Sequence, residues 1–227
     1  SISLRDPSLY ANRELSQLDF NFRVLAQAQD PSMPLLERLR FLCISCTNLD
    51  EFFEIRGGSV RHMMEFGGPP SPDGLSPATL LNRIHDRAAE LVQAQYRCFY
   101  EELRPALAEQ GIRLLQREQW SDEQTAWLRE YFRNEIMPVL SPLGLDPAHP
   151  FPKILNKSLN IVVVLKGKDA FGRAGHLAIV RAPRSLPRII HLPQRVSGGE
   201  NDFVLLSSVL SVFVDELFPG MEVKGSY

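Results

Sequence analysis

The chain has 227 residues, 44% of them hydrophobic and 23% charged, which is the ordinary range for globular proteins and enough for one large domain or two small ones. The formal net charge of −2 and the pI of about 6.2 give it no global cationic field to attract nucleic acid, and no apolar run approaches the roughly 20 residues of a membrane span. Three cysteines, an odd number, argue against a disulfide framework and favour a reducing cytoplasm.

Three helices are predicted in the first hundred residues. Apolar residues recur there at three- and four-residue spacing, which lines one face of a helix. The pattern runs from Asn12 to Leu25, from Leu35 to just before Phe66, and from the Ser76–Pro77 start signal to Pro105. Prolines and glycines, which disfavour helix, separate the three segments. We therefore expect an N-terminal three-helix bundle over residues 1–106.

The second predicted helix carries a long apolar seam. Its alternating four- and three-residue steps predict a helix packed lengthwise on its neighbours, with Leu49 and Phe53 as anchors in the bundle. Gly57–Gly58 weakens this helix by about 1 kcal/mol per glycine relative to alanine. The seam consists of Leu35, Leu39, Leu42, Cys46, Leu49 and Phe53.

A mixed α+β head domain is predicted over residues 107–227, so the expected fold class is α+β with two domains. Ser121 and Gln124 have the spacing of a capping box, which opens a helix that ends at Pro138. The β-branched run 159–165 is typical of a buried central strand. A last amphipathic helix is expected from Val209 to Leu217. The remaining expected strands are 112–115, 177–180, 188–192 and 204–206.

The segment Thr47–Phe53 carries more chemistry than core packing needs. An amide, two acids and two adjacent aromatics indicate a ligand or a partner surface. The amide of Asn48 offers a donor and an acceptor that match the adenine edge, although spacing alone also fits a polar residue on a solvated helix flank. Asp50, Glu51 and Glu54 suit a solvated acidic stripe better than a magnesium site.

The cysteines do not predict a metal site. Cys43 and Cys46 have the spacing of half a zinc site, but the chain contains no second cysteine pair, and Cys98 is alone. We interpret them as small core side chains.

Three sequence blocks resemble the N-terminal domain of bacterial polyphosphate kinases, the family that makes polyphosphate from ATP. The likeness continues through Gln110–Ile112, the helix around Trp127 and Pro187–Arg188, which resemble the head domain of that family. It therefore covers nearly the whole chain. The three blocks are residues 12–25, 34–42 and 48–53.

This resemblance implies a phosphotransferase that reversibly transfers the γ-phosphate of ATP to polyphosphate, through a phosphohistidine and with Mg²⁺. In the family, the histidine and the Mg²⁺ ligands belong to C-terminal domains that we do not find in this chain. We therefore predict no catalytic and no metal-binding residue here, and expect the chain to be inactive alone. The resemblance also implies a homodimer or higher homo-oligomer built through the head domain. The histidines to which we assign no catalytic role are His62, His85, His149, His176 and His191.

One nucleotide-binding residue follows from the resemblance. In the family, the asparagine that precedes Leu-Asp-Glu-Phe contacts the adenine end of ATP, and Asn48 matches that position. The chain departs from the family pattern at Gln17, where tryptophan is usual, and at Gly57–Gly58, where a helix former is expected.

Basic residues concentrate in the second half of the chain. They fit a groove for polyphosphate, because a linear polyanion needs spaced cations, and they equally fit ordinary strand-edge and loop positions. No glycine-rich phosphate loop occurs in the sequence. The basic residues are Lys153, Lys157, Lys166, Lys168, Arg173, Arg181, Arg184 and Arg188.

Two other classes of function remain open from the sequence. One is a nonenzymatic assembly module onto which a separate catalytic chain docks. The other is a stand-alone nucleotide-binding regulator, which would bind ATP tightly without partners.

Overall fold

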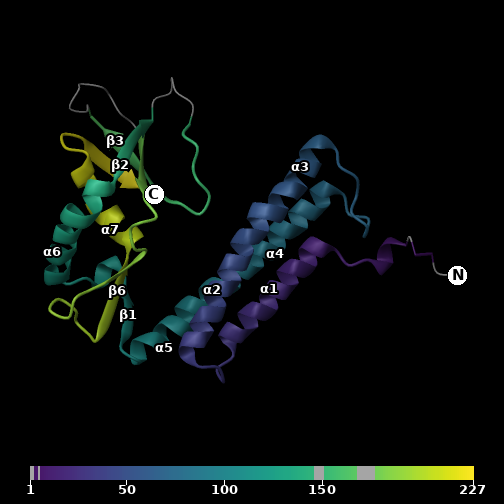
Figure 1. The fold of residues 1–227 in the computed structure, drawn as a ribbon, viewed down its shortest axis with the longest axis horizontal. Coiled ribbons are helices and arrows are strands. Elements are labelled where there is room, and N and C mark those ends of the chain that lie inside the picture. The colour runs from purple at the N-terminus through teal and green to yellow at the C-terminus, as the bar shows by residue number, and fades with distance from the viewer. Residues whose placement is uncertain (1–2, 5, 146–150, 168–176) are drawn as a thin grey trace. The chain divides into compact units, whose positions relative to one another are not determined.

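The structure, a computed structural model, describes residues 3–4, 6–145, 151–167 and 177–227. Contacts within the chain divide it into two compact units, Ser1–Glu109 and Gln110–Tyr227 (Figure 1). The first is helical, and the second combines helices with two sheets, which confirms the predicted α+β class.

Three continuous helical segments build the N-terminal unit, as predicted for a three-helix bundle (Figure 1). The second and third segments each contain a short π-helical stretch, in which the turns are wider than in an α-helix. The elements are η1 (Pro7–Leu9), α1 (Arg13–Gln29), α2 (Leu35–Phe52), η2 (Phe53–Gly57), α3 (Gly58–Phe66), α4 (Pro77–Arg97), η3 (Cys98–Leu103) and α5 (Arg104–Glu109).

Polar side chains cap the first and third helical segments. Asn12 Oδ1 accepts hydrogen bonds from two main-chain N–H groups in the first turn of α1, each at 3.1 Å. Ser76 Oγ accepts from the N–H of Thr79 at 3.2 Å, and Pro77 is the first residue of α4. The predicted start of the third helix is thereby confirmed.

The third helical segment continues past Pro105, where the sequence predicts its end. In η3 the N–H of Arg104 donates to the carbonyl of Phe99, five residues back instead of four. Pro105 then lies in the first turn of α5, where a helix tolerates a residue without an N–H. The wider turn therefore lets the helix pass a residue that normally ends it.

The buried face of α2 differs from the predicted seam at two positions. Cys46 is exposed, and so is Phe53, with 44% of its surface accessible, so neither anchors the bundle. The buried positions lie one residue earlier, because the face that meets α1 and α4 follows three-, four- and three-residue steps. The buried residues of α2 are Leu42, Ser45, Leu49 and Phe52.

The C-terminal unit begins with a strand and a capped helix. The Ser121 capping box is confirmed: the N–H of Gln124 donates to Ser121 Oγ at 3.1 Å, and the N–H of Ser121 donates to Gln124 Oε1 at 3.0 Å. The elements are β1 (Ile112–Leu115), η4 (Arg117–Gln119), α6 (Asp122–Tyr131), η5 (Phe132–Ile136), η6 (Met137–Val139), β2 (Ser141–Leu145), β3 (Leu159–Lys166), β4 (Leu177–Ala182), β5 (Ile189–His191), β6 (Asn201–Leu205), α7 (Leu206–Phe213), η7 (Val214–Leu217) and β7 (Glu222–Ser226).

The strands in the described part of this unit form two sheets. The larger is antiparallel with the order β2-β4-β3-β7, so β3 is central as predicted. The smaller has the order β1-β6-β5, and β1 pairs with β6 in parallel. Two edge strands, β2 and β7, were not predicted. Pro142 and Gly144 in β2 obscure its pattern, but an edge strand tolerates a proline because one side needs no ladder bond.

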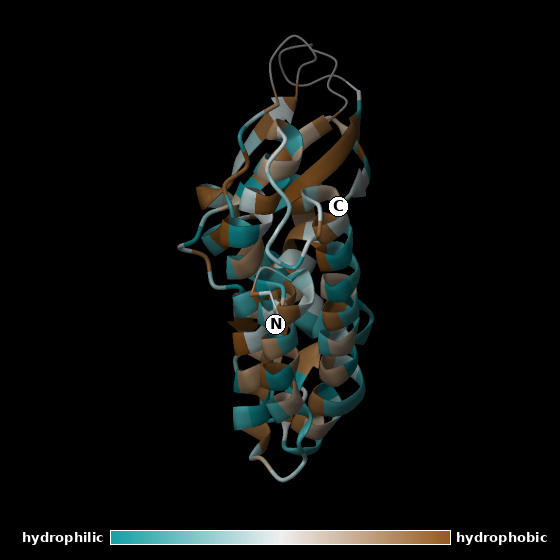
Figure 2. Ribbon diagram, turned by 90° about the vertical axis from the view of Figure 1, so that its right-hand side faces the viewer, coloured by the Kyte–Doolittle hydropathy of each residue, from teal (hydrophilic) through white to brown (hydrophobic). Residues whose placement is uncertain are grey.

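Each unit has its own hydrophobic core. In the C-terminal unit the helices α6 and α7 and the turn η5 pack on the sheet residues, and the rings of Phe132 and Phe213 lie 5.7 Å apart. The helices alternate hydrophobic and hydrophilic bands, as amphipathic helices do (Figure 2). Among the described residues, no helix is long and apolar enough to cross a membrane.

Candidate functional site

The side chain of Asn48 lies between α2 and α1. It is half-buried, and its Nδ2 lies 3.4 Å from Oδ1 of Asn21 on α1, a long hydrogen bond. Asn21 is only 3% exposed, and its own Nδ2 donates to the main-chain carbonyl of Ser45 at 2.8 Å. The predicted nucleotide-binding residue is therefore the outer member of a polar network that continues into the bundle.

This network spans all three long helices of the bundle. Ser45 on α2 is fully buried, and its Oγ receives a hydrogen bond of 2.9 Å from Nε2 of Gln95 on α4. A buried polar group destabilises the fold unless it is hydrogen-bonded, so these contacts fix how the helices lie against one another. We name Asn21, Ser45, Asn48 and Gln95 the bundle network.

Sequence reasoning missed the inner members of the bundle network, although a signal was present. Gln95 falls in the apolar repeat of the third helix, four residues after Leu91. Asn21 falls in that of the first, three residues after Leu18 and four before Leu25. A polar residue at an apolar position indicates a buried hydrogen-bond partner.

The acids of the segment stay in solvent. Asp50, Glu51 and Glu54 are exposed. The nearby Arg61 pairs with Glu65 at 3.0 Å. Among the described residues no group of three or more histidines, cysteines or acids could hold a metal ion.

A π-turn closes the segment and accounts for one of its glycines. The ring of Phe53 lies edge-on to that of Phe52, with centroids 5.4 Å apart. A Cβ atom at Gly57 would lie 2.9 Å from Cδ1 of Phe53, whereas a Cβ at Gly58 would meet nothing within 4 Å. Gly57 therefore makes room for the Phe53 ring on the helix surface. π-turns occur frequently at functional sites.

The cysteines contribute no reactive group to this segment. Cys43 and Cys46 are exposed, so the interpretation of them as core side chains is wrong. Cys98 is fully buried as expected, and its burial raises the pKa of the thiol.

The described histidines are dispersed. His62 packs on Phe66 with ring centroids 4.4 Å apart, and His191 stacks on Phe203 at 4.7 Å. His85 is exposed beside Asp86. His149 and His176 lie outside the described residues.

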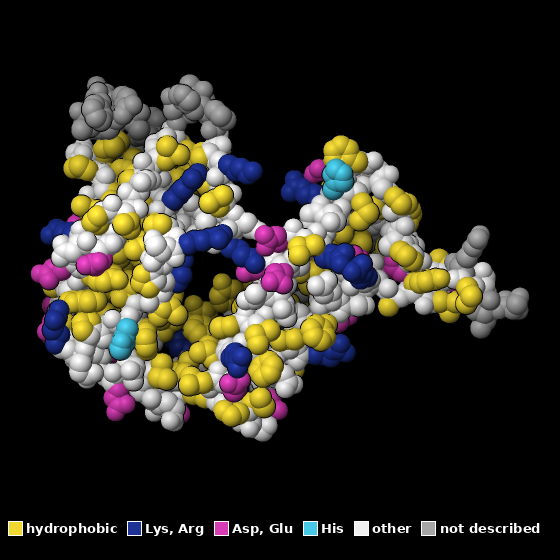
Figure 3. Space-filling model, viewed as in Figure 1, with side chains coloured by type: hydrophobic (Ala, Val, Ile, Leu, Met, Phe, Trp, Pro, Cys, Tyr) yellow, Lys and Arg dark blue, Asp and Glu magenta, His cyan; other side chains and the backbone are white. Residues whose placement is uncertain are grey.

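Two of the basic residues hold a loop in place. Arg181 Nη2 donates to the carbonyl of Lys153 at 3.0 Å, and Arg184 Nη2 donates to the carbonyl of Asn156 at 3.1 Å. Arg181 and Arg184 are exposed, and several Lys and Arg side chains lie on the face of the C-terminal unit seen in Figure 3. These arginines therefore have a structural role and also add to a basic surface.

The remaining basic residues are less closely grouped. Lys166 is exposed at the end of β3, and Arg188 is half-buried with one guanidinium nitrogen lacking a hydrogen-bond partner. Lys168 and Arg173 lie outside the described residues.

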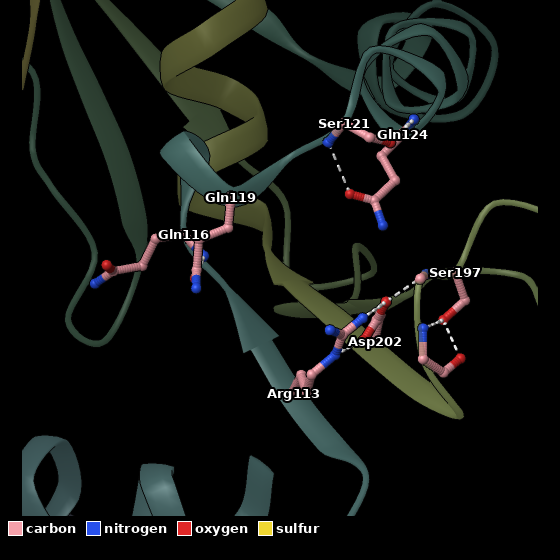
Figure 4. Close-up of polar contacts among 9 residues, drawn as sticks. Arg113, Gln116, Gln119, Ser121, Gln124, Ser197 and Asp202 are labelled. Carbon is pink, nitrogen blue, oxygen red and sulfur yellow. Dashed lines mark hydrogen bonds and ion pairs between the residues drawn. The ribbon is translucent and has the colours of Figure 1, made fainter.

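An ion pair that the sequence did not predict joins β1 to β6 (Figure 4). Arg113 contacts the fully buried Asp202 through two nitrogens, at 2.6 and 2.7 Å, and the N–H of Gly198 donates to the same carboxylate at 2.8 Å. A Cβ at Gly199 would lie 2.9 Å from Arg113 Nε, so the glycine loop lets the guanidinium approach. Burial alone would raise the pKa of Asp202, but hydrogen bonds from Arg113, Ser197 and Gly198 outweigh it and hold this pKa below its ordinary value.

Two family models match the chain in order. The model described as the polyphosphate kinase N-terminal domain matches residues 10–115, and the model described as the polyphosphate kinase middle domain matches residues 123–227. Together they account for nearly all of the sequence.

Relatives named polyphosphate kinase match all or nearly all of the chain. A polyphosphate kinase of Xylella fastidiosa (strain Temecula1) is 71% identical over all of this chain, which spans 33% of that protein. One of Burkholderia multivorans is 53% identical over 98% of this chain, which spans 32% of that protein. The chain thus spans about a third of the length of the curated relatives it matches.

A solved structure has the same fold. The crystal structure of polyphosphate kinase from Porphyromonas gingivalis superimposes with a TM-score of 0.81 and 30% identity, and the match covers 95% of this chain and 32% of that one.

Proposed function

The chain belongs to the polyphosphate kinase family, of which it carries the N-terminal and middle domains, and we propose that the full-length protein reversibly transfers the γ-phosphate of ATP to polyphosphate. In this proposal the phosphate passes through a phosphohistidine, and Mg²⁺ accompanies the nucleotide. Among the described residues no group of three or more histidines, cysteines or acids could hold a metal ion, and the proposal assigns the Mg²⁺ ligands to the rest of the protein.

The observation that carries the proposal is the 71% identity, over the whole chain, to a protein named polyphosphate kinase. The proposal assigns the phosphoacceptor histidine to the remaining part of the protein. The 227 residues then contribute part of the nucleotide site and no catalytic group.

The test compares the full-length protein with the 227-residue chain. We expect the full-length protein with ATP and Mg²⁺ to form polyphosphate, detected on gels, and to carry an acid-labile phosphate on histidine. We expect the isolated chain to form none. Absence of polymer with the full-length protein would contradict the proposed activity. Polyphosphate synthesis by the isolated 227 residues would contradict the proposal that they carry no catalytic group.

We assign Asn48 to the adenine end of ATP. Its side chain is half-buried at the edge of the bundle, and its Oδ1 accepts no hydrogen bond from the described residues. An amide with a free acceptor and a spare N–H suits the edge of adenine, where a donor and an acceptor lie side by side.

Replacement of Asn48 tests this assignment. We expect Asn48→Ala in the full-length protein to raise the KM for ATP about tenfold, because the base loses one paired contact, and to leave kcat nearly unchanged. The matched control is Thr47→Ala, an exposed neighbour on the same helix that should leave KM unchanged. Equal KM values for the Asn48→Ala variant and the wild type would remove Asn48 from the nucleotide site.

We also propose a cytoplasmic homodimer or higher homo-oligomer that forms through the C-terminal unit and binds polyphosphate on its basic surface. Ile189 and Leu205 pair across β5 and β6 and are 55% and 36% exposed, so this unit has an exposed apolar pair that a partner subunit could cover. Sedimentation of the full-length protein over a range of concentrations measures the oligomeric state, and a monomer at all concentrations would contradict the proposal.

A further inference from the structure

The orientation of the Asn21 amide is fixed by its partner. The main-chain carbonyl of Ser45 can only accept a hydrogen bond, so the Asn21 atom that lies 2.8 Å from it must be Nδ2. The opposite atom of the amide, Oδ1, then faces Asn48 as an acceptor.

This acceptor in turn orients Asn48. With Asn21 Oδ1 at 3.4 Å, Asn48 directs its Nδ2 toward α1 and its own Oδ1 away from it. If the amide of Asn48 were reversed, two carbonyl oxygens would face each other beside a group that is 3% exposed. Such an unpaired contact is costly in a buried setting.

We infer that Asn21 is a positioning residue that makes the enzyme favour ATP over nucleotides whose base carries an oxygen in place of the 6-amino group. The inference rests on the proposed function, in which Asn48 contacts adenine. With its Oδ1 facing outward beside the second N–H, Asn48 accepts from the amino group of adenine and donates to the neighbouring ring nitrogen. At the N1 edge guanine presents the reverse pattern, an acceptor oxygen beside a ring N–H donor, so Asn48 would have to reverse its amide to pair with it.

Asn21 acts through Asn48 and not on the nucleotide. Its burial leaves it no exposed surface to offer a ligand. Its effect on base selectivity should therefore vanish when Asn48 is removed, which distinguishes positioning from general stabilisation of the bundle.

The experiment measures kcat/KM of the full-length protein for ATP and for GTP. Asn21→Leu keeps the side-chain volume and removes both polar atoms, so it should lower the ATP-to-GTP ratio about tenfold, the scale of one lost base contact. Asn21→Asp keeps an acceptor facing Asn48, so its ATP-to-GTP ratio of kcat/KM should stay close to that of the wild type, even though the hydrogen bond to the Ser45 carbonyl is lost.

Gln95→Leu is the matched structural control. Gln95 is 6% exposed and belongs to the same bundle network, but it contacts Ser45 and not Asn48. This variant should lower the melting temperature and leave the nucleotide ratio unchanged. An equal fall in the ratio for Gln95→Leu and Asn21→Leu would overturn the positioning role.

Double variants separate the positioning role of Asn21 from the nucleotide contact of Asn48. In an Asn48→Ala background, Asn21→Leu should change the ratio no further. If Asn48→Ala lowers the ratio and Asn21→Leu does not, the positioning role is wrong while the nucleotide contact of Asn48 stands. If Asn48→Ala leaves the ratio unchanged, the nucleotide contact itself is wrong and the inference falls with it. If Asn21→Leu fails to fold, Asn21→Asp provides the test. A fall of about tenfold in its ATP-to-GTP ratio of kcat/KM would also overturn the positioning role.

Discussion

At the residue scale, the two glycines that follow the Thr47–Phe53 segment differ in what surrounds them. Gly57 stands where the polyphosphate kinase pattern is expected to carry a helix former, and the reason is the Phe53 ring, which occupies the space of a Cβ. The neighbouring Gly58 has no such neighbour. Two adjacent glycines of the same helix therefore have different roles, and only one of them is required by packing.

Alanine should stabilise the chain at Gly58 and not at Gly57. Gly58→Ala should raise the free energy of unfolding by about 0.5–1 kcal/mol, because alanine restricts the unfolded chain and favours helix. Gly57→Ala should lower it or leave it unchanged, because its Cβ meets Phe53. Chemical denaturation followed by helical circular dichroism measures both. In a Phe53→Ala background, Gly57→Ala should raise the free energy of unfolding as Gly58→Ala does. If it does not, the Phe53 ring is not the cause of the difference.

At the scale of elements, an ion pair between the half-exposed Arg113 and the buried Asp202 carboxylate links the parallel strands β1 and β6. Arg113 and Asp202 are direct partners in the strand register, and the glycine loop before β6 completes the contacts of the carboxylate. Removing Arg113 should cost more than the pair's net contribution, because the buried carboxylate of Asp202 would stay behind without its partner. This contact fixes which residue of β1 lies beside which residue of β6.

Acid should weaken this sheet in a defined window. The pKa of Asp202 is lower in the folded chain than its ordinary value of 3.8, so its contribution is complete above that pH and is lost as pH falls through the lower folded pKa. We expect Arg113→Leu, which removes the first of the contacts that lower this pKa, to lose much less stability between pH 5 and pH 2, roughly the span over which such a carboxylate acts. The measurement is urea denaturation at each pH. Parallel pH profiles of the wild type and Arg113→Leu would contradict the assignment.

The whole molecule consists of two units with separate cores. No buried residue is shared between the two clusters of the described chain, one within Ser1–Glu109 and the other within Gln110–Tyr227. Each core is assembled from elements of its own half of the chain.

A core truncation should therefore act on one unit. Leu91 is fully buried in the N-terminal unit, so Leu91→Ala should lower the free energy of unfolding of that unit by about 3 kcal/mol. Hydrogen exchange resolved along the chain should show faster exchange in α1, α2 and α4 and unchanged exchange in β3. Equal acceleration in β3 would show that the two units unfold as one.

The sequence by itself determined the features that depend on local order. Helical periodicity, the caps at Ser76 and Ser121 and the β-branched run of β3 specify elements through contacts a few residues apart, and the family blocks carry Asn48 with them. Tertiary structure alone decided that Phe52 rather than Phe53 is buried, that β2 and β7 join the sheet, and that Asn21 orients Asn48. These outcomes depend on which face meets a distant neighbour and which polar atom finds a partner there, and residues far apart in the chain decide both.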